Sequence, residues 1–580
     1  MLTRLSSRAR RAAFVVLAAG AVGYLGAGAT MQGPRFYPDD PIAREPESQD
    51  ASKAAPFDVS EIYDLTYNLF VNSKHVPSGL RAQNINTIDE VPDSSWFTNR
   101  IGTRAITTDE ITRGANVNAP PDPSKWVVIR EKTSGAHPGF TAVDAKGQTW
   151  FLEFDPPKFA EGATGAVAVA TKIFWALGYN QVESFLTTFD PKVATIDPTA
   201  TIRRPNGKRT RFTHDDLDVV FENVYRNKDG TYRVVAGRLL PGKILGGFQY
   251  ADTRPDDPND LVPHEHRREL RALRVFGAWT NLTDLKAKNT LDTVITENGK
   301  PIVKHYLQDV GSTFGMCNDY HEWDLSWEYF YEGGPSWKRL FTFGFGLSPW
   351  QTVDYVEYPS VGKFEGKVWD PIDWRPQTPT KAYMELRADD AFWAARRIAA
   401  FSDDLIRAAV HEGQFSDPAA EKYLADVLIQ RREKIKSVYL TAVNPIVNPR
   451  LDAKGLTFEN AAVDGGVAQG SVAYRASWMR FDNATGATTP ISESKGATTT
   501  IAAPSGLPSG FVAVDIAADS DAYPAWKQPV RAFFRQDGGN WKLVGLQRLP
   551  ENLPSANIEN FKKGQMVEPA KKAEAPKKEN

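Results

Sequence analysis

Four side chains in one part of the chain are of the types that phosphoryl transfer requires. Asp284, Lys286 and Asn289 stand close together, and Asp309 follows further along. Moving a phosphate onto a hydroxyl takes a carboxylate near the attacking hydroxyl, a cation near the migrating phosphate, and carboxylate or amide oxygens that hold magnesium. We therefore expect Asp284 and Lys286 to act in catalysis. Asn289 and Asp309 are the expected metal ligands.

The surrounding sequence has the patterns of a helix followed by a hairpin. These patterns are the helical composition of residues 265–279 and the strand-like alternation of 291–296 and 302–308. Asn298 and Gly299, between the two strands, are a strong signal for a hairpin turn. The loop between helix and hairpin thus carries Asp284, and the end of the hairpin presents Asp309.

A sheet-rich region precedes this core. Strands are expected at 126–131, 140–143, 148–155, 182–188, 202–212, 219–224 and 232–240. One helix is expected to begin at Thr164 and to end at Gly178, because apolar residues recur there at helical spacing. Two further helices are expected at 389–410 and 419–440.

The composition favours a folded protein of several domains. The chain has 580 residues, 41% of them hydrophobic, with 15 Trp and 31 Phe, which allows two to four domains with sizeable cores. The net charge is −2 and no basic block lies outside the termini. This balance does not favour nucleic acid or an anionic membrane as the main partner. The oligomeric state stays open.

The N-terminus has the pattern of an export signal. Four arginines precede an apolar run from Ala12 to Ala29, which ends in small residues. We expect residues 1–29 to be a signal peptide or an uncleaved anchor, and the protein to be exported, either periplasmic or secreted. An uncleaved segment is the expected membrane contact. The single cysteine, Cys317, cannot form an internal disulfide and is expected to be an inert buried thiol.

The rest of the chain divides by composition. Residues 30–124 are expected to be a linker and N-terminal extension, because their first part is rich in Pro, Asp, Glu and Ser. Residues 447–549 contain short alternating runs typical of a small β-sandwich, and 550–580 are expected to be a disordered tail rich in Lys, Ala and Pro.

Residues 127–440 resemble the protein-kinase-like superfamily, in its atypical bacterial and secreted branch of HipA-like and CotH-like kinases. The matching motifs are Asp284-Leu285-Lys286-Ala287-Lys288-Asn289 and Asp309-Val310-Gly311. The outline of the whole chain resembles exported bacterial proteins of that type. The resemblance implies an α+β, bilobal kinase-like fold followed by the small all-β domain, with a small lobe at 125–250 and a large lobe at 251–446.

The same resemblance implies ATP with Mg or Mn in a cleft between the lobes. Gly135 and Gly139 would cover the nucleotide phosphates. Kinases grip those phosphates with a Lys on the third strand, paired with a Glu of the next helix, where this chain has Glu153 and Val167. The cation is then expected from Lys158, Lys172 or Lys132, or is absent.

The residues leave three functions open. The first is a phosphotransferase that moves phosphate from ATP to a hydroxyl of a secreted protein, a cell-envelope sugar or a small molecule. The second is a catalytically silent kinase fold that binds a ligand or an envelope protein. The third is a nucleotidyl transferase on the same fold. A purely structural role is also open for Asp284 and Asn289, in which their side chains cap the loop by hydrogen bonds to backbone amides.

Overall fold

The computed structural model describes residues 34–562, except 133–136, 205, 317–326, 348–351 and 469. The expected export segment, Gly135, Cys317 and the last part of the tail lie outside the described residues. Among the helices of the described part, none combines the length and the apolarity that a bilayer span requires.

The small lobe is built on one sheet and one long helix. Its strands are β1 (Trp126–Glu131), β2 (Gly139–Asp144), β3 (Thr149–Phe154), β4 (Ser184–Phe189), β5 (Ala194–Ile196) and β8 (Tyr232–Arg238), in the order β4-β8-β3-β2-β1-β5. Trp150, Leu152 and Phe154 alternate into the core on one face of β3. Glu153 therefore points to the other face. Helix α4 (Gly162–Leu177) follows β3 directly.

A ribbon and a short helix are appended to this sheet. They are β6 (Thr201–Arg203), β7 (Arg209–Arg211) and α5 (His214–Phe221). The strand expected at 219–224 is wrong, because its first residues belong to α5. Thr213 and Asp216 form a capping box, in which each side chain bonds the backbone of the other residue. This cap satisfies the first amides of a helix and starts α5.

The large lobe combines a three-stranded sheet with a layer of helices. Its strands are β9 (Lys243–Gly246), β10 (Leu291–Glu297) and β11 (Lys300–Tyr306), and its helices are α6 (Arg268–Thr280), α7 (Gly333–Phe341), α8 (Lys381–Met384), α9 (Ala388–Ala399), α10 (Asp403–His411) and α11 (Pro418–Tyr439). The hairpin β10–β11 has the expected turn, with positive φ at Asn298 and Gly299. Strand β9 pairs with β10, so residues that we assigned to the small lobe complete the sheet of the large one.

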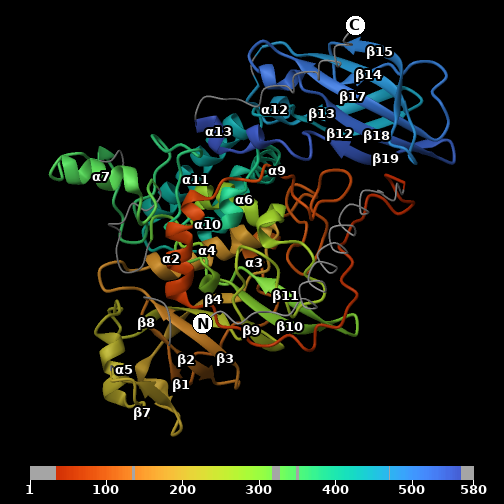
Figure 1. Cartoon of the computed structure of the whole chain (residues 1–580). Helices are drawn as coiled ribbons and strands as arrows, with labels where there is room; N and C mark the ends of the chain where they lie inside the picture. The colour runs from red at the N-terminus through yellow and green to blue at the C-terminus, as the bar shows by residue number, and fades with distance from the viewer. Residues whose placement is uncertain are drawn as a thin grey trace, which may run out of the picture.

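The C-terminal domain contains two antiparallel sheets. They hold β12 (Ile446–Asp452), β13 (Gly455–Asn460) and β16 (Thr500–Ile501) in one, and β14 (Ala473–Phe481), β15 (Thr488–Gly496), β17 (Phe511–Asp519), β18 (Val530–Asp537) and β19 (Asn540–Gln547) in the other. Figure 1 shows this domain in blue above the helices of the large lobe, with the small lobe at the opposite end. The α+β class, with two lobes followed by a β-rich domain, is confirmed.

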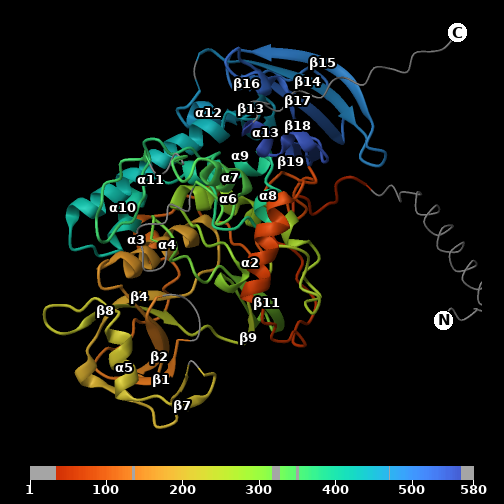
Figure 2. The ribbon, with the colours of Figure 1, turned by 60° about the vertical axis from the view of Figure 1, so that its left-hand side comes forward.

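The N-terminal extension packs along the whole molecule. It contains α2 (Glu61–Phe70) and α3 (Thr108–Arg113). Phe36 inserts among Phe481, Phe511 and Phe533 of the C-terminal domain. Further along, Arg44 pairs with Glu297 of β10 at 2.8 Å. Figure 2 shows α2 beside the large lobe, above β9 and β11.

The start of the expected disordered tail is also packed. Asn557 donates hydrogen bonds from Nδ2 to the carbonyl oxygens of Met384 and Leu386, at 2.9 and 3.0 Å. Ile558 is buried, and α13 (Glu559–Lys562) places Glu559 against Arg274 of α6. Residues 550–562 therefore differ from the expectation, because they bond the loop between α8 and α9.

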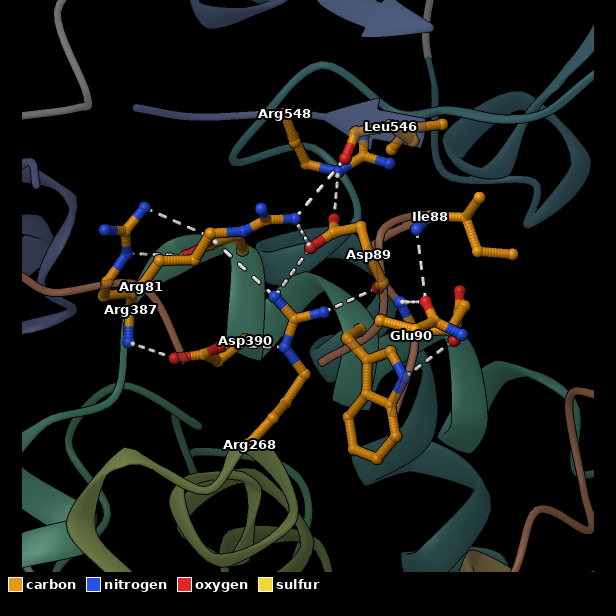
Figure 3. Close-up of polar contacts among 12 residues, drawn as sticks. Arg81, Ile88, Asp89, Glu90, Arg268, Arg387, Asp390, Leu546 and Arg548 are labelled. Carbon is orange, nitrogen blue, oxygen red and sulfur yellow. Dashed lines mark hydrogen bonds and ion pairs between the residues drawn. The ribbon is translucent and has the colours of Figure 1, made fainter. Parts of the chain in front are cut away.

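A buried network of arginines and carboxylates joins these parts (Figure 3). Arg268 of α6 is fully buried and pairs with Asp89 of the N-terminal extension and with Asp390 of α9, each at 2.9 Å. Asp89 also pairs with Arg81 at 2.8 Å and lies 3.7 Å from Arg548, just after β19. Burial alone would raise the pKa of Asp89, but the charges of these three arginines outweigh it and lower the pKa.

We expect Asp89→Asn to destabilise the protein by roughly 3–5 kcal/mol at neutral pH, because it leaves buried arginines without their shared anion. Asn tolerates the left-handed backbone of position 89, where φ is 67°, so the change isolates the charge. Denaturant midpoints measure the effect. Asp218→Asn, at an exposed position of α5, is the control.

The same pair of proteins tests the sign of the pH dependence. A carboxyl whose pKa is lowered by folding stabilises above its unfolded pKa of about 4, and this stabilisation is lost as the pH falls. The difference between the wild type and Asp89→Asn should therefore shrink below about pH 4. An unchanged midpoint at neutral pH would show that the network adds no stability.

Candidate functional site

The loop after α6 brings together the residues that the sequence singled out. Asn281 ends α6 in the left-handed conformation, with φ 60°. Asp284 Oδ2 lies 3.0 Å from Lys286 Nζ. Asn289 donates from Nδ2 to the carbonyl oxygen of Asp284 at 2.9 Å, and its own carbonyl accepts the amide of Asp309 at 2.9 Å. The loop is thus bonded both internally and to the segment after β11.

Asp309 stands in a tight turn at the mouth of the cleft. Its Oδ1 accepts the amide of Gly311 at 3.0 Å. A Cβ on Gly311 would lie 3.0 Å from Val167 of α4, so the turn packs closely under that helix. Asp309 is exposed as a residue, although atoms of both lobes surround its carboxylate. Burial by these atoms, and the charge of nearby Glu153, raise the pKa of Asp309.

Two adjoining pockets form the cleft, each of about 260 Å³. They share Phe151, Glu153, Gln308 and Asp309. The inner pocket is mostly apolar, and its lining includes Val167, Val182, Val235, Leu239, Leu291 and Val310. The outer pocket is polar, and its lining includes Glu61, Arg130, Lys132, Lys286, Lys288 and Asn289. The cleft thus offers an apolar compartment beside a polar one, whose lining carries four basic and four acidic side chains.

An ion pair crosses the sheet in the outer pocket. Lys132, just after β1, lies 2.8 Å from Glu153 of β3. Desolvation acts to raise the pKa of Glu153, but the charges of Lys132 and His137 and the hydrogen bond from Lys132 together lower it. Lys132 also donates to the carbonyl oxygen of His137 at 3.1 Å. Of the lysines that the sequence offered as the phosphate-binding cation, Lys132 is the one that lines the cleft.

The other two lysines lie elsewhere. Lys158 is exposed on the turn between β3 and α4 and is absent from the linings of both pockets. Lys172 is buried, and its Nζ donates to the carbonyl oxygen of Arg113 at 2.9 Å. Five residues separate it from Val167, which places it about 140° away around α4 at about 100° per residue. Burial lowers the pKa of Lys172 to about 8.

Gly139 has a structural reason to be glycine. It pairs with Glu153 at the start of β2, and a Cβ there would lie 2.3 Å from the carbonyl oxygen of Leu152. Close approach of the two strands therefore excludes a side chain at this position. The expectation that Gly139 covers phosphates has no separate support in this geometry.

The N-terminal extension supplies acidic residues that the sequence analysis missed. Glu61 of α2 lies 3.0 Å from Lys286, and Asp64 accepts the amide of Ala287 at 3.0 Å. Asp58 contacts Lys288. The charges of Asp284 and Glu61 raise the pKa of Lys286, although its partial burial acts to lower it. Glu61 and Asp64 stand three residues apart in the first turn of α2, and that spacing is the signal that predicts an acidic face turned toward lysines.

The cleft fits a divalent cation that takes only some of its ligands from the protein and the rest from phosphates and water. Within the described residues, no group of three or more His, Cys, Asp or Glu side chains is arranged to hold a metal. Asp309 and Asn289 both line the outer pocket, and Glu153 lies close enough to Asp309 to raise its pKa. Mg²⁺ in nucleotide sites takes one or two carboxylates and completes its shell with phosphates and water. This donor set meets that requirement.

Comparisons with known proteins add little to this geometry. No family model and no curated protein matches the chain. Among solved structures, the Golgi casein kinase and the same kinase with Mn/ADP bound align with 70% of this chain and with 97% and 98% of their own chains. Both are 12% identical to it, with TM-scores of 0.27. Similarity at that level carries no argument here.

We expect Gly139→Ala to destabilise the small lobe by about 1–3 kcal/mol, because the new methyl group meets the Leu152 carbonyl at a distance that forces the strands apart. Faster hydrogen exchange in β2 and β3 is the measurement. Gly334→Ala, where a Cβ meets nothing within 4 Å, is the control. Equal exchange in both variants would contradict this account.

Proposed function

We propose that the protein is a phosphotransferase that moves phosphate from ATP, with Mg or Mn, to a hydroxyl. The observation that carries the proposal is the cleft itself. Asn289 and Asp309 line it together with the Lys132–Glu153 pair. Asp284 is not part of the lining, but its carbonyl oxygen accepts from Asn289 and its carboxylate pairs with Lys286, which does line it. An apolar compartment of the size of the polar one adjoins them.

The two compartments divide the nucleotide between them. The apolar pocket under α4 receives the base, since apolar walls favour a flat ring over a charged group. The polar pocket receives the phosphates, with Lys132, just after β1, in the role that kinases give to a lysine on the third strand. In kinases the partner carboxylate comes from the following helix, whereas here Glu153 of β3 supplies it.

The loop residues act on the acceptor and on the metal. Asp284 orients the attacking hydroxyl and takes up its proton. Lys286, held 3.0 Å from Asp284, stays protonated and offsets charge on the transferred group. Asn289 and Asp309 hold the metal, which neutralises charge on the phosphates when it is bound.

The proposed reaction takes place outside the cytoplasm, on an acceptor that carries a hydroxyl. The arginines and the apolar run before residue 30 support export to the periplasm or beyond. Acceptors there include hydroxyls of secreted proteins and of cell-envelope sugars. This setting also favours the atypical secreted branch of the superfamily over the cytosolic one.

Binding of ATP with Mg or Mn to the purified protein is the first test, by calorimetry beside Asp309→Ala. We expect metal-dependent binding that weakens at least tenfold in the variant, because Asp309 is the one carboxylate among the proposed ligands. Asp404→Ala, at an exposed position of α10, is the control. A folded wild-type protein that binds ATP with neither metal would overturn the proposal and favour the silent binding fold. Mass spectrometry of products separates phosphate from nucleotide transfer.

A second comparison tests which lysine grips the phosphates. We expect Lys132→Met to weaken ATP binding at least tenfold, because it removes a charge-assisted contact in the outer pocket. Lys158→Met and Lys172→Met should change the affinity less than twofold, since neither side chain lines the cleft. Weakened binding in Lys172→Met, with Lys132→Met unaffected, would contradict the assignment.

A further inference from the structure

A second cavity lies behind the cleft, with a volume of about 610 Å³. The polar residues that line it come from several separate segments and include Arg100, Asn118, Gln181, Glu183, Arg238 and Lys304. Arg238, Leu239 and Leu240 line both this cavity and the apolar pocket of the cleft. The end of β8 is therefore a wall between the two spaces. None of the residues assigned to phosphate transfer lines the second cavity.

The cavity holds cations in excess over anions. Arg100 lies 4.7 Å from the ring centre of Trp175 and donates to the Trp175 carbonyl at 2.6 Å, at the end of α4. Burial lowers the pKa of Arg100 to about 10, and it also lowers that of Lys304. The charge of Asp93 acts on Arg100, and those of Glu297 and Glu47 act on Lys304, but they do not outweigh burial. Holding two such cations in a partly buried space is unfavourable unless a further anion joins them.

Glu183, the acidic residue of the lining, is already bonded. Its carboxylate accepts the amides of Val117 and Asn118 at 2.6 and 2.8 Å, and the Asn118 side chain at 2.9 Å. Arg238 lies 3.6 Å from it. These contacts hold Glu183 against the N-terminal extension. The cationic excess at Arg100 and Lys304 therefore remains.

Gln181 adds an unsatisfied polar group. The side chain is 5% exposed, and neither Nε2 nor Oε1 has a hydrogen-bond partner among the described residues. Leaving both ends of a buried amide without partners is costly. A ligand that satisfies both ends must accept one hydrogen bond and donate another.

We propose that this cavity binds a phosphate ester that carries free hydroxyls, of the class of the sugar phosphates. The phosphate oxygens accept from Arg100 and Lys304. Gln181 Nε2 and Oε1 are closed to solvent in this structure, so the Gln181 side chain turns toward the cavity to donate to a phosphate oxygen and to accept from a ligand hydroxyl. The volume lies in the range that small ligands occupy in protein pockets. The proposal is independent of the phosphotransferase assignment, because it uses none of the same side chains.

Calorimetric titration of the full-length protein with glucose 1-phosphate, glucose 6-phosphate and ribose 5-phosphate tests the proposal. We expect at least one to bind saturably, and Lys304→Gln to weaken that binding at least tenfold, because it removes a charge-assisted contact. Gln181→Leu should weaken it as well. Lys158→Gln, an exposed lysine outside the cavity, should leave it unchanged.

Control titrations show which part of the ligand is recognised and whether the cavity binds it independently of the cleft. Glucose alone should not bind, and inorganic phosphate should bind more weakly than the ester. Lys132→Met should retain sugar-phosphate binding, and Lys304→Gln should retain the wild-type affinity for ATP with magnesium. Absence of saturable binding by all three esters would overturn the proposal, as would equal affinity in Lys304→Gln. Inorganic phosphate that binds as tightly as every ester would overturn the assignment to sugar phosphates.

Discussion

The buried charge network around Arg268 is the constraint on which the arrangement of the parts depends. An arginine in a protein interior is tolerable only where carboxylates surround it, and each carboxylate here comes from a different part of the chain. Asp89 belongs to the N-terminal extension and Asp390 belongs to α9. Arg548, just after β19, links the C-terminal domain to Asp89. Helix α6 is held from several sides, and the loop that follows it starts from a fixed point.

Local sequence signals predicted the elements nearest the cleft. The hairpin β10–β11 follows from Asn298-Gly299, and α4 follows β3 as its apolar spacing indicates. The placement of Asp309 beside Asn289 follows from these elements, because a loop before a hairpin and the residues after it meet at the same end. Helix α5 was not predicted, although Thr213 and Asp216 stand at the spacing of a capping box, because residues 219–224 are apolar enough to resemble a strand.

The remaining features depend on contacts between distant segments. Whether Lys132, Lys158 or Lys172 reaches the cleft is decided by strand pairing and by the rotation of α4, and neither is visible in composition. The N-terminal extension and residues 550–562 were expected to be spacer and tail because polar, Pro-rich sequence usually is solvated. Their order comes from individual ion pairs and buried anchors such as Phe36 and Asn557, which have no periodic pattern.

Phe36 fixes the chain to the C-terminal domain before the chain reaches the cleft. Its ring is clamped among the phenylalanines of the C-terminal domain, and only further along does the chain reach α2 and the lysines of the loop. A pull on the chain ahead of residue 34 is therefore borne by the C-terminal domain before it reaches Glu61. Because Phe36 is fixed before the chain reaches α2, the contacts of Glu61 and Asp64 with the loop do not depend on the residues ahead of it.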